Sequence, residues 1–183
     1  MLQMGKTSKV AVRPEADAAR GRLSGRLVIM NQHEEAAHRA WSAGDLVAAF
    51  ASFRRGANEG HPGCMLDLGY FFDEGLGTAR SKHQAMHWYR RAFTCGVLAA
   101  ATNVALLFRE RGGYRKMYRW LQIGGQRGDG DALVEIARCC LDGLGTARSR
   151  TMATSYARKA LRTGQITPAG RNEAALLAAG RRA

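Results

Sequence analysis

The sequence predicts an all-α fold: a right-handed solenoid of helix pairs with four repeats and a C-terminal capping helix. Only 3 of its 183 residues are prolines, and alanine is abundant while β-branched residues are sparse, a balance that favours helices. The heptapeptide GLGTARS occurs at 75–81 and again at 143–149. Around both copies, apolar residues recur at the i, i+3, i+4, i+7 spacing of one helical stripe.

Each heptapeptide lies between two such stripes, so the repeating unit is a helix, a glycine loop and a second helix. Two shorter copies of the unit precede and separate the long ones. A period of this size built from helix pairs is typical of a solenoid, in which neighbouring pairs share one core. The stripes around the first heptapeptide are Met65, Leu68, Gly69 and Phe72, then Ala85, Trp88, Tyr89 and Ala92. The expected repeats are 29–60, 61–96, 97–128 and 129–164.

The two ends of the chain differ from the repeats. Residues 1–28 lack sustained periodicity and are expected to form a flexible basic tail. Residues 165–183 are expected to form a capping helix and a basic end, because the last repeat of a solenoid has no neighbour to cover it.

The glycines of the repeated heptapeptide are interpreted as a structural joint. Gly75, Gly77, Gly143 and Gly145 are expected to adopt positive φ between two packed helices. Ser81 is expected to cap the following helix, with Gln84 completing a capping box. The alternative, a loop that cradles phosphate, would follow a strand and carry a lysine-serine pair, and the sequence has neither.

The stretch LGYFFDEGLGTARSKHQAMHWYRRA resembles the Sel-1-like repeat, a relative of the tetratricopeptide repeat. The resemblance covers 29–164 and implies that the first helix of each pair lines a concave groove in which a protein or peptide binds. By this register the expected groove residues are Glu34, His38, Trp41, Leu66, Tyr70, Asp73, Thr102, Leu106, Arg109, Val134, Arg138 and Leu141.

The net charge of +13 indicates an anionic partner of some kind, without choosing among them. Basic pairs recur near the end of the second helix of three repeats: Arg54-Arg55, Arg90-Arg91 and Arg158-Lys159. We interpret them as solvated helix ends favoured by the helix dipole. The alternative is a basic ridge that tracks an acidic ligand such as nucleic acid.

No motif points to catalysis, a cofactor or a metal. His83 and His87 have a metal-binding spacing, but zinc needs at least one further ligand and none is nearby in sequence. A secreted branch of the resembled family carries a disulfide in each repeat. Cys64, Cys95, Cys139 and Cys140 do not reproduce that pattern, so β-lactamase-like activity remains only a distant analogy.

The sequence therefore predicts a non-catalytic adaptor or scaffold that binds a protein or peptide, acidic in part, in its concave groove. A nucleic-acid-binding solenoid is the alternative. No apolar run is long enough to span a membrane and no secretory signal is recognisable, so a cytoplasmic location is expected.

Overall fold

A computed structural model describes residues 32–180 of the chain, and within this range it contains helices and no strand. The predicted basic tail, 1–28, and the terminal Arg181 and Arg182 lie outside the described residues. The helices are α1 (Gln32–Ser42), α2 (Leu46–Asn58), α3 (Pro62–Glu74), α4 (Lys82–Thr94), α5 (Ala99–Glu110), α6 (Tyr114–Gln126), α7 (Gly130–Asp142), α8 (Arg150–Leu161) and α9 (Pro168–Ala178).

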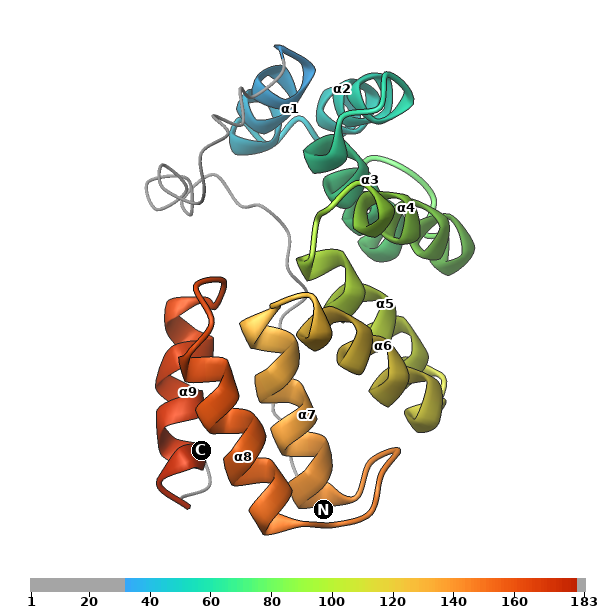
Figure 1. Cartoon of the computed structure of the whole chain (residues 1–183). Coiled ribbons are helices and arrows are strands. Elements are labelled where there is room, and N and C mark those ends of the chain that lie inside the picture. The colour runs from blue at the N-terminus through green and yellow to red at the C-terminus, as the bar shows by residue number, and fades with distance from the viewer. Residues whose placement is uncertain (1–31, 181–183) are drawn as a thin grey trace.

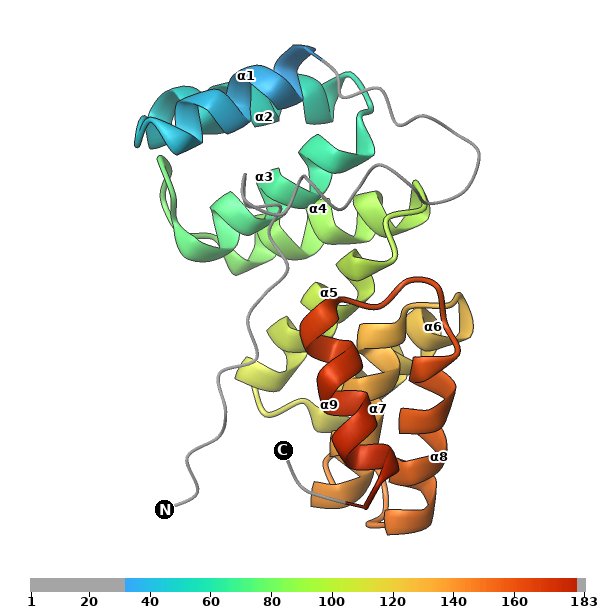
Figure 2. The same ribbon diagram turned by 90° about the vertical axis from the view of Figure 1, so that its left-hand side faces the viewer.

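The helices form four consecutive pairs, and α9 packs on the last of them (Figure 1). Each helix packs most extensively against its sequence neighbour, as in a solenoid. Between pairs, odd-numbered helices also meet, α1 against α3, α5 against α7 and α7 against α9. The odd-numbered helices therefore line the inner side of the stack and α2, α4, α6 and α8 the outer side, an order that Figure 2 follows from α1 at the top to α8 at the bottom.

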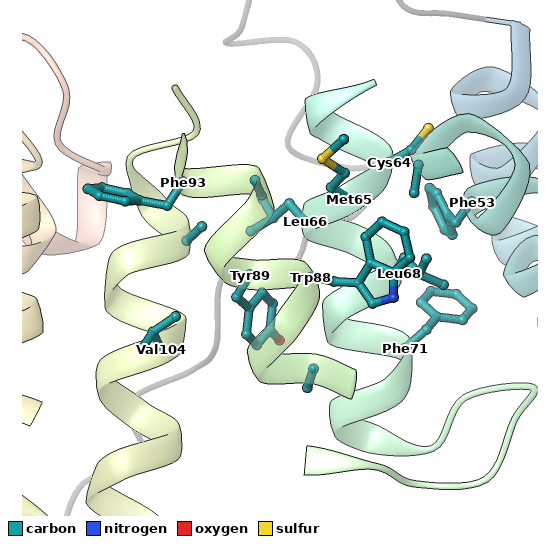
Figure 3. Close-up of a cluster of buried hydrophobic side chains, with 14 of the residues drawn as sticks. Phe53, Cys64, Met65, Leu66, Leu68, Phe71, Trp88, Tyr89, Phe93 and Val104 are labelled. Atoms are coloured by element: carbon teal, nitrogen blue, oxygen red, sulfur yellow. The ribbon is translucent and has the colours of Figure 1, made fainter. Parts of the chain in front are cut away.

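The stack has two hydrophobic clusters that meet at α5. The first extends from α1 to α5 and includes Phe53, Phe71 and Trp88, which Figure 3 labels. The second extends from α5 to α9. Because Val104 belongs to the first cluster and Ala105 to the second, α5 joins the two halves of the solenoid.

The four loop glycines have φ between 62° and 74°, in the left-handed region expected from the sequence. Gly75 ends α3 in a left-handed cap, and both its N–H and that of Leu76 donate to the carbonyl of Phe71, at 2.8 and 2.9 Å. Gly77 lies against the first turn of α2, where any Cβ would collide with the Leu46 carbonyl. Gly145 stands in the same relation to the first turn of α6. The repeated loop is thus a joint that holds two pairs together.

Capping side chains begin several helices, as the sequence predicts for Ser81. The backbone N–H of Gln84 donates to Ser81 Oγ at 3.3 Å, and Ser149 caps α8 in the same way. The capping box, however, is only half formed, because the Ser81 N–H donates across the loop to the Phe72 carbonyl at 2.8 Å. The Ser81 N–H therefore does not donate to the side-chain oxygen of Gln84, as a complete capping box would require.

The capping helix α9 covers the open end of the second cluster. Ala174 and Leu177 are buried against α7 and α8, while Leu176 is 40% exposed. Leu176 and Leu177, neighbours in sequence, therefore face different environments. Thr167 ties the helix start to the preceding pair, since its hydroxyl donates to Asp131 Oδ1 at 2.8 Å. No helix between residues 32 and 180 is long and apolar enough to cross a bilayer.

Candidate protein-binding groove

The inner helices carry all twelve residues that the sequence places in the groove, but only five of the side chains are partly exposed. These five are Trp41, Tyr70, Arg109, Arg138 and Leu141. The other seven are buried: Glu34, His38, Leu66, Asp73, Thr102, Leu106 and Val134.

The burial has a physical reason, because inner helices of successive pairs pack on one another. The repeat register therefore places more residues in the groove than this short stack leaves accessible. The side chains accessible to a ligand are therefore the five partly exposed ones and not all twelve. The buried seven act through packing and hydrogen bonding.

One part of the inner side is aromatic and lies over α1 and α3. The rings of Trp41 and Tyr70 are 6.0 Å apart between centroids, and Trp41 also meets Phe71 edge-on at 5.2 Å. The His38 ring also stacks on Trp41, with 6.1 Å between the centroids. Contacts on several sides fix the Trp41 ring, so a partner would meet a surface that is already ordered.

The other part is charged and lies over α5, α7 and α9. The Arg138 guanidinium donates to Glu135 Oε1 at 2.8 Å and to both carboxylate oxygens of Glu173. Burial raises the pKa of the Glu135 carboxyl, although Arg138 and Arg109 act in the opposite direction. Arg138 is therefore committed to an ion-pair network that joins α7 to α9, and a ligand would have to compete with two carboxylates for it.

Three buried polar side chains meet between α1 and α3: Glu34, His38 and Asp67. One possible ligand atom of each lies within 4.8 Å of the others, and His38 Nε2 is 3.4 Å from Asp67 Oδ2. Gly63 makes room for the group, since a Cβ there would collide with the Glu34 carboxylate. This is the one grouping within residues 32–180 whose side chains could together ligate a metal. We read it as a charge network linking two inner helices.

Asp73 belongs to a polar group that links α3 to α4 and, through Lys82, to α5. Its carboxylate pairs with Lys82 and accepts a 3.3 Å hydrogen bond from the Tyr89 hydroxyl. Lys82 also pairs with Glu110 of α5 at 2.7 Å. In the other half, Thr102 donates to Asp129 Oδ2 at 3.2 Å, which links α5 to the cap of α7. The acids Asp67, Asp129, Glu135 and Glu173 were not singled out from the sequence, where nothing but a polar residue beside an apolar stripe marks them.

A family model for the Sel1 repeat matches the chain at 62–97 and 130–164. The chain carries Sel1 repeats. The two matched ranges cover the second and fourth helix pairs, the ones that contain the repeated heptapeptide. The resemblance inferred from the LG, glycine-loop and A-x-x-W-Y pattern is therefore confirmed.

Two solved structures have the same fold. A Sel1 repeat protein from Oxalobacter formigenes is 24% identical with a TM-score of 0.64, over 70% of this chain and 56% of that one. A protective antigen present in uropathogenic Escherichia coli strains, displaying an SLR fold, is 23% identical with a TM-score of 0.55, over 62% of this chain and 25% of that one. The chain thus spans just over half of the first protein and a quarter of the second. No curated protein matches it.

Sel1 and SLR repeat proteins are typically non-catalytic, and the thiols of this chain are poorly suited to nucleophilic chemistry. All four cysteines are free, and Cys64, Cys139 and Cys140 are buried. Burial raises the pKa of Cys64 and of Cys139 to about 12. A thiol with so high a pKa stays protonated near neutral pH, whereas the thiolate is the reactive form.

We expect a thiol reagent to label Cys95 alone in the native protein. Cys95 is exposed after the end of α4, and the other three thiols are buried and hold their protons. Titration with a chromogenic disulfide should release one equivalent natively and four after denaturation, with the native count unchanged at mildly alkaline pH. The Cys95→Ser variant serves as the control and should release none. Fast labelling of any thiol in the native Cys95→Ser variant would show that one of the hydrophobic clusters opens readily.

Proposed function

We propose that this protein is a non-catalytic scaffold that binds a protein or peptide on the inner side of its Sel1 repeat stack. The observation that carries the proposal is the stack itself, because Sel1 repeats generally serve as protein-interaction scaffolds. The inner side adds a fixed aromatic pair, Trp41 and Tyr70, of residue types that dominate binding energy at protein interfaces.

The charge of the inner helices indicates which peptide would suit them. Helices α1, α3, α5 and α7 carry three basic residues, Arg39, Arg109 and Arg138. The same helices carry nine acidic residues: Glu34, Glu35, Asp67, Asp73, Glu74, Glu110, Asp131, Glu135 and Asp142. Complementary potentials steer and orient binding. The proposed groove ligand is therefore a basic segment with apolar side chains, in place of the partly acidic partner expected from net charge.

The proposal is tested by placing a photo-crosslinking amino acid on the inner side, at Tyr70 or at Leu141, and on the outer side at the exposed Met152. Extract from the source cell is treated with nuclease before capture, so that nucleic acid cannot bridge the two proteins. We expect a discrete crosslinked protein from the inner positions and none from Met152. Crosslinking from Met152 alone would contradict partner binding on the inner side.

Binding of the purified partner is then compared between two double variants, each of which replaces two large side chains by serine. Tyr70→Ser with Leu141→Ser removes two groove side chains, and Val47→Ser with Met152→Ser removes two exposed outer ones. Removing two interface side chains of this kind should weaken binding by about 1–3 kcal/mol in total. Circular dichroism checks that both variants fold. Equal affinities of the two variants would contradict the proposal.

A further inference from the structure

The outer helices of the solenoid carry basic residues and no acidic ones. Within α2, α4, α6 and α8 there is no Asp or Glu. The eleven basic residues on them are Arg54, Arg55, Lys82, Arg90, Arg91, Arg115, Lys116, Arg119, Arg150, Arg158 and Lys159. Cations are favoured at helix C-termini, but Arg115, Lys116 and Arg150 lie in first turns, where the helix dipole opposes them. Helix capping alone therefore does not explain this distribution.

Four of these eleven cations lie over aromatic rings: Arg54, Arg90, Arg91 and Lys116. Of the eleven, Lys82 is the one that forms a salt bridge to another described residue. The Arg91 guanidinium lies 4.9 Å from the centroid of the Trp88 ring, and Arg90 lies 5.6 Å from that of Trp120. Stacking on a ring orders a guanidinium while its N–H donors stay available to an anion. The outer face is thus a set of partly ordered donors.

Hydroxyl groups accompany the basic residues on α8. One surface depression there is lined by Arg150, Thr151, Thr154, Ser155, Arg158, Lys159 and Arg162. A second depression on α4 is lined by His83, Met86, His87, Arg90, Arg91 and Thr94. Arginine, lysine, serine and threonine side chains are the usual donors to the phosphate oxygens of nucleic acids.

We propose that this outer basic face, formed by α2, α4, α6 and α8, binds the phosphate backbone of a nucleic acid without reading its sequence. Eight of its eleven cations are arginines, whose planar forks match phosphate oxygens. A flat anionic membrane is a poorer fit, because firm membrane attachment also needs an apolar patch, and the exposed large apolar side chains of the described helices are the separate Val47, Met152 and Leu176. Basic residues recur on all four outer helices, as an extended polyanion requires.

The test measures binding of the full chain to labelled duplex DNA and single-stranded RNA of mixed sequence, over a series of salt concentrations. Arg90→Gln with Arg91→Gln, and Arg158→Gln with Lys159→Gln, each remove two cations from the outer basic face. The matched control, Arg39→Gln with Arg171→Gln, removes two exposed cations from α1 and α9 and so changes the net charge equally. An acidic peptide and anionic vesicles serve as competing ligands.

We expect each outer variant to weaken binding by about tenfold at near-physiological salt and to flatten the dependence of log affinity on log salt by roughly one per lost phosphate contact. The control should lose about twofold at most, since long-range charge is screened at that salt. DNA and RNA should respond alike. Equal losses in the control and outer variants would overturn the proposal, as would wild-type binding to the peptide or the vesicles in preference to both nucleic acids.

Discussion

Gly77→Val is expected to lower the free energy of unfolding by roughly 2–6 kcal/mol. Two costs add in this estimate: about 1–3 kcal/mol for a non-glycine residue held at positive φ, and a similar amount for forcing extra volume into a packed site. Both apply, because Gly77 has a φ of 62° and its missing Cβ faces the Leu46 carbonyl. Urea denaturation followed by far-UV circular dichroism measures the loss.

Gly112→Val separates the two costs. Gly112 also has positive φ, at 69°, in the short loop of the third pair, but a Cβ there would meet nothing within 4 Å. It should therefore lose only the 1–3 kcal/mol of backbone strain. A loss at Gly77 no larger than at Gly112 would show that the loop does not lock onto α2. Gly145→Val should behave as Gly77→Val does, because Gly145 faces the Tyr114 carbonyl of α6 in the same way.

The same variants test whether the loop is a joint or a ligand site. Gly77 lies against the first turn of the outer helix α2 and is not one of the five groove side chains, so the folded fraction of Gly77→Val should keep the partner affinity of the wild type. A variant with full stability and lost binding would instead make the repeated loop part of a binding surface.

The helix pairs and loops could be predicted because they depend on local sequence. Apolar spacing fixes the face that each helix buries, glycine allows the left-handed turn, and Ser81 or Ser149 supplies an N-cap. These features repeat at 68 residues, so two copies gave independent support for one interpretation. The family model matches the same two pairs.

The inner surface could be predicted less well, because accessibility depends on how successive pairs approach one another. Leu66 and Val134 hold equivalent positions in the repeat, and Leu106 holds the position equivalent to Tyr70 and Arg138; Leu66, Leu106 and Val134 are each only 3% exposed. The ion pair between Arg138 and Glu173 joins residues 35 apart in sequence, and Asp67 meets His38 across two inner helices. No local pattern encodes distances of that kind.

The basic residues of the outer helices could be found in the sequence, and the structure adds further residues to the same side. The pairs Arg54-Arg55, Arg90-Arg91 and Arg158-Lys159 were visible in the sequence. The structure adds Arg115, Lys116 and Arg119 of α6 to the same outer side, since all three are exposed. The outer helix of the third pair, α6, therefore carries as many basic residues as α4 of the second pair and α8 of the fourth.

Trp88→Ala is expected to cost about 3–5 kcal/mol of stability, the usual range for removing a buried tryptophan. Trp88 is 8% exposed and belongs to the first hydrophobic cluster, with Phe53 and Phe71 (Figure 3). The cavity left behind would be bounded by helices of two successive pairs and could not close without moving them. Urea denaturation followed by far-UV circular dichroism is the measurement, because tryptophan fluorescence changes with the substitution itself.

Trp120→Ala provides the matched comparison, since Trp120 occupies the same repeat position 32 residues later. The repeat register alone predicts the same loss of stability at both positions. Trp120, however, is only partly buried at the junction of the two clusters, where it contacts the Phe93 ring and the Arg90 guanidinium. Its loss should cost about 1–2 kcal/mol, because a half-buried side chain removes less apolar surface from water. Equal losses at the two positions would mean that the junction at α5 is packed as tightly as the cluster interior, and the two halves of the solenoid would then unfold as one unit.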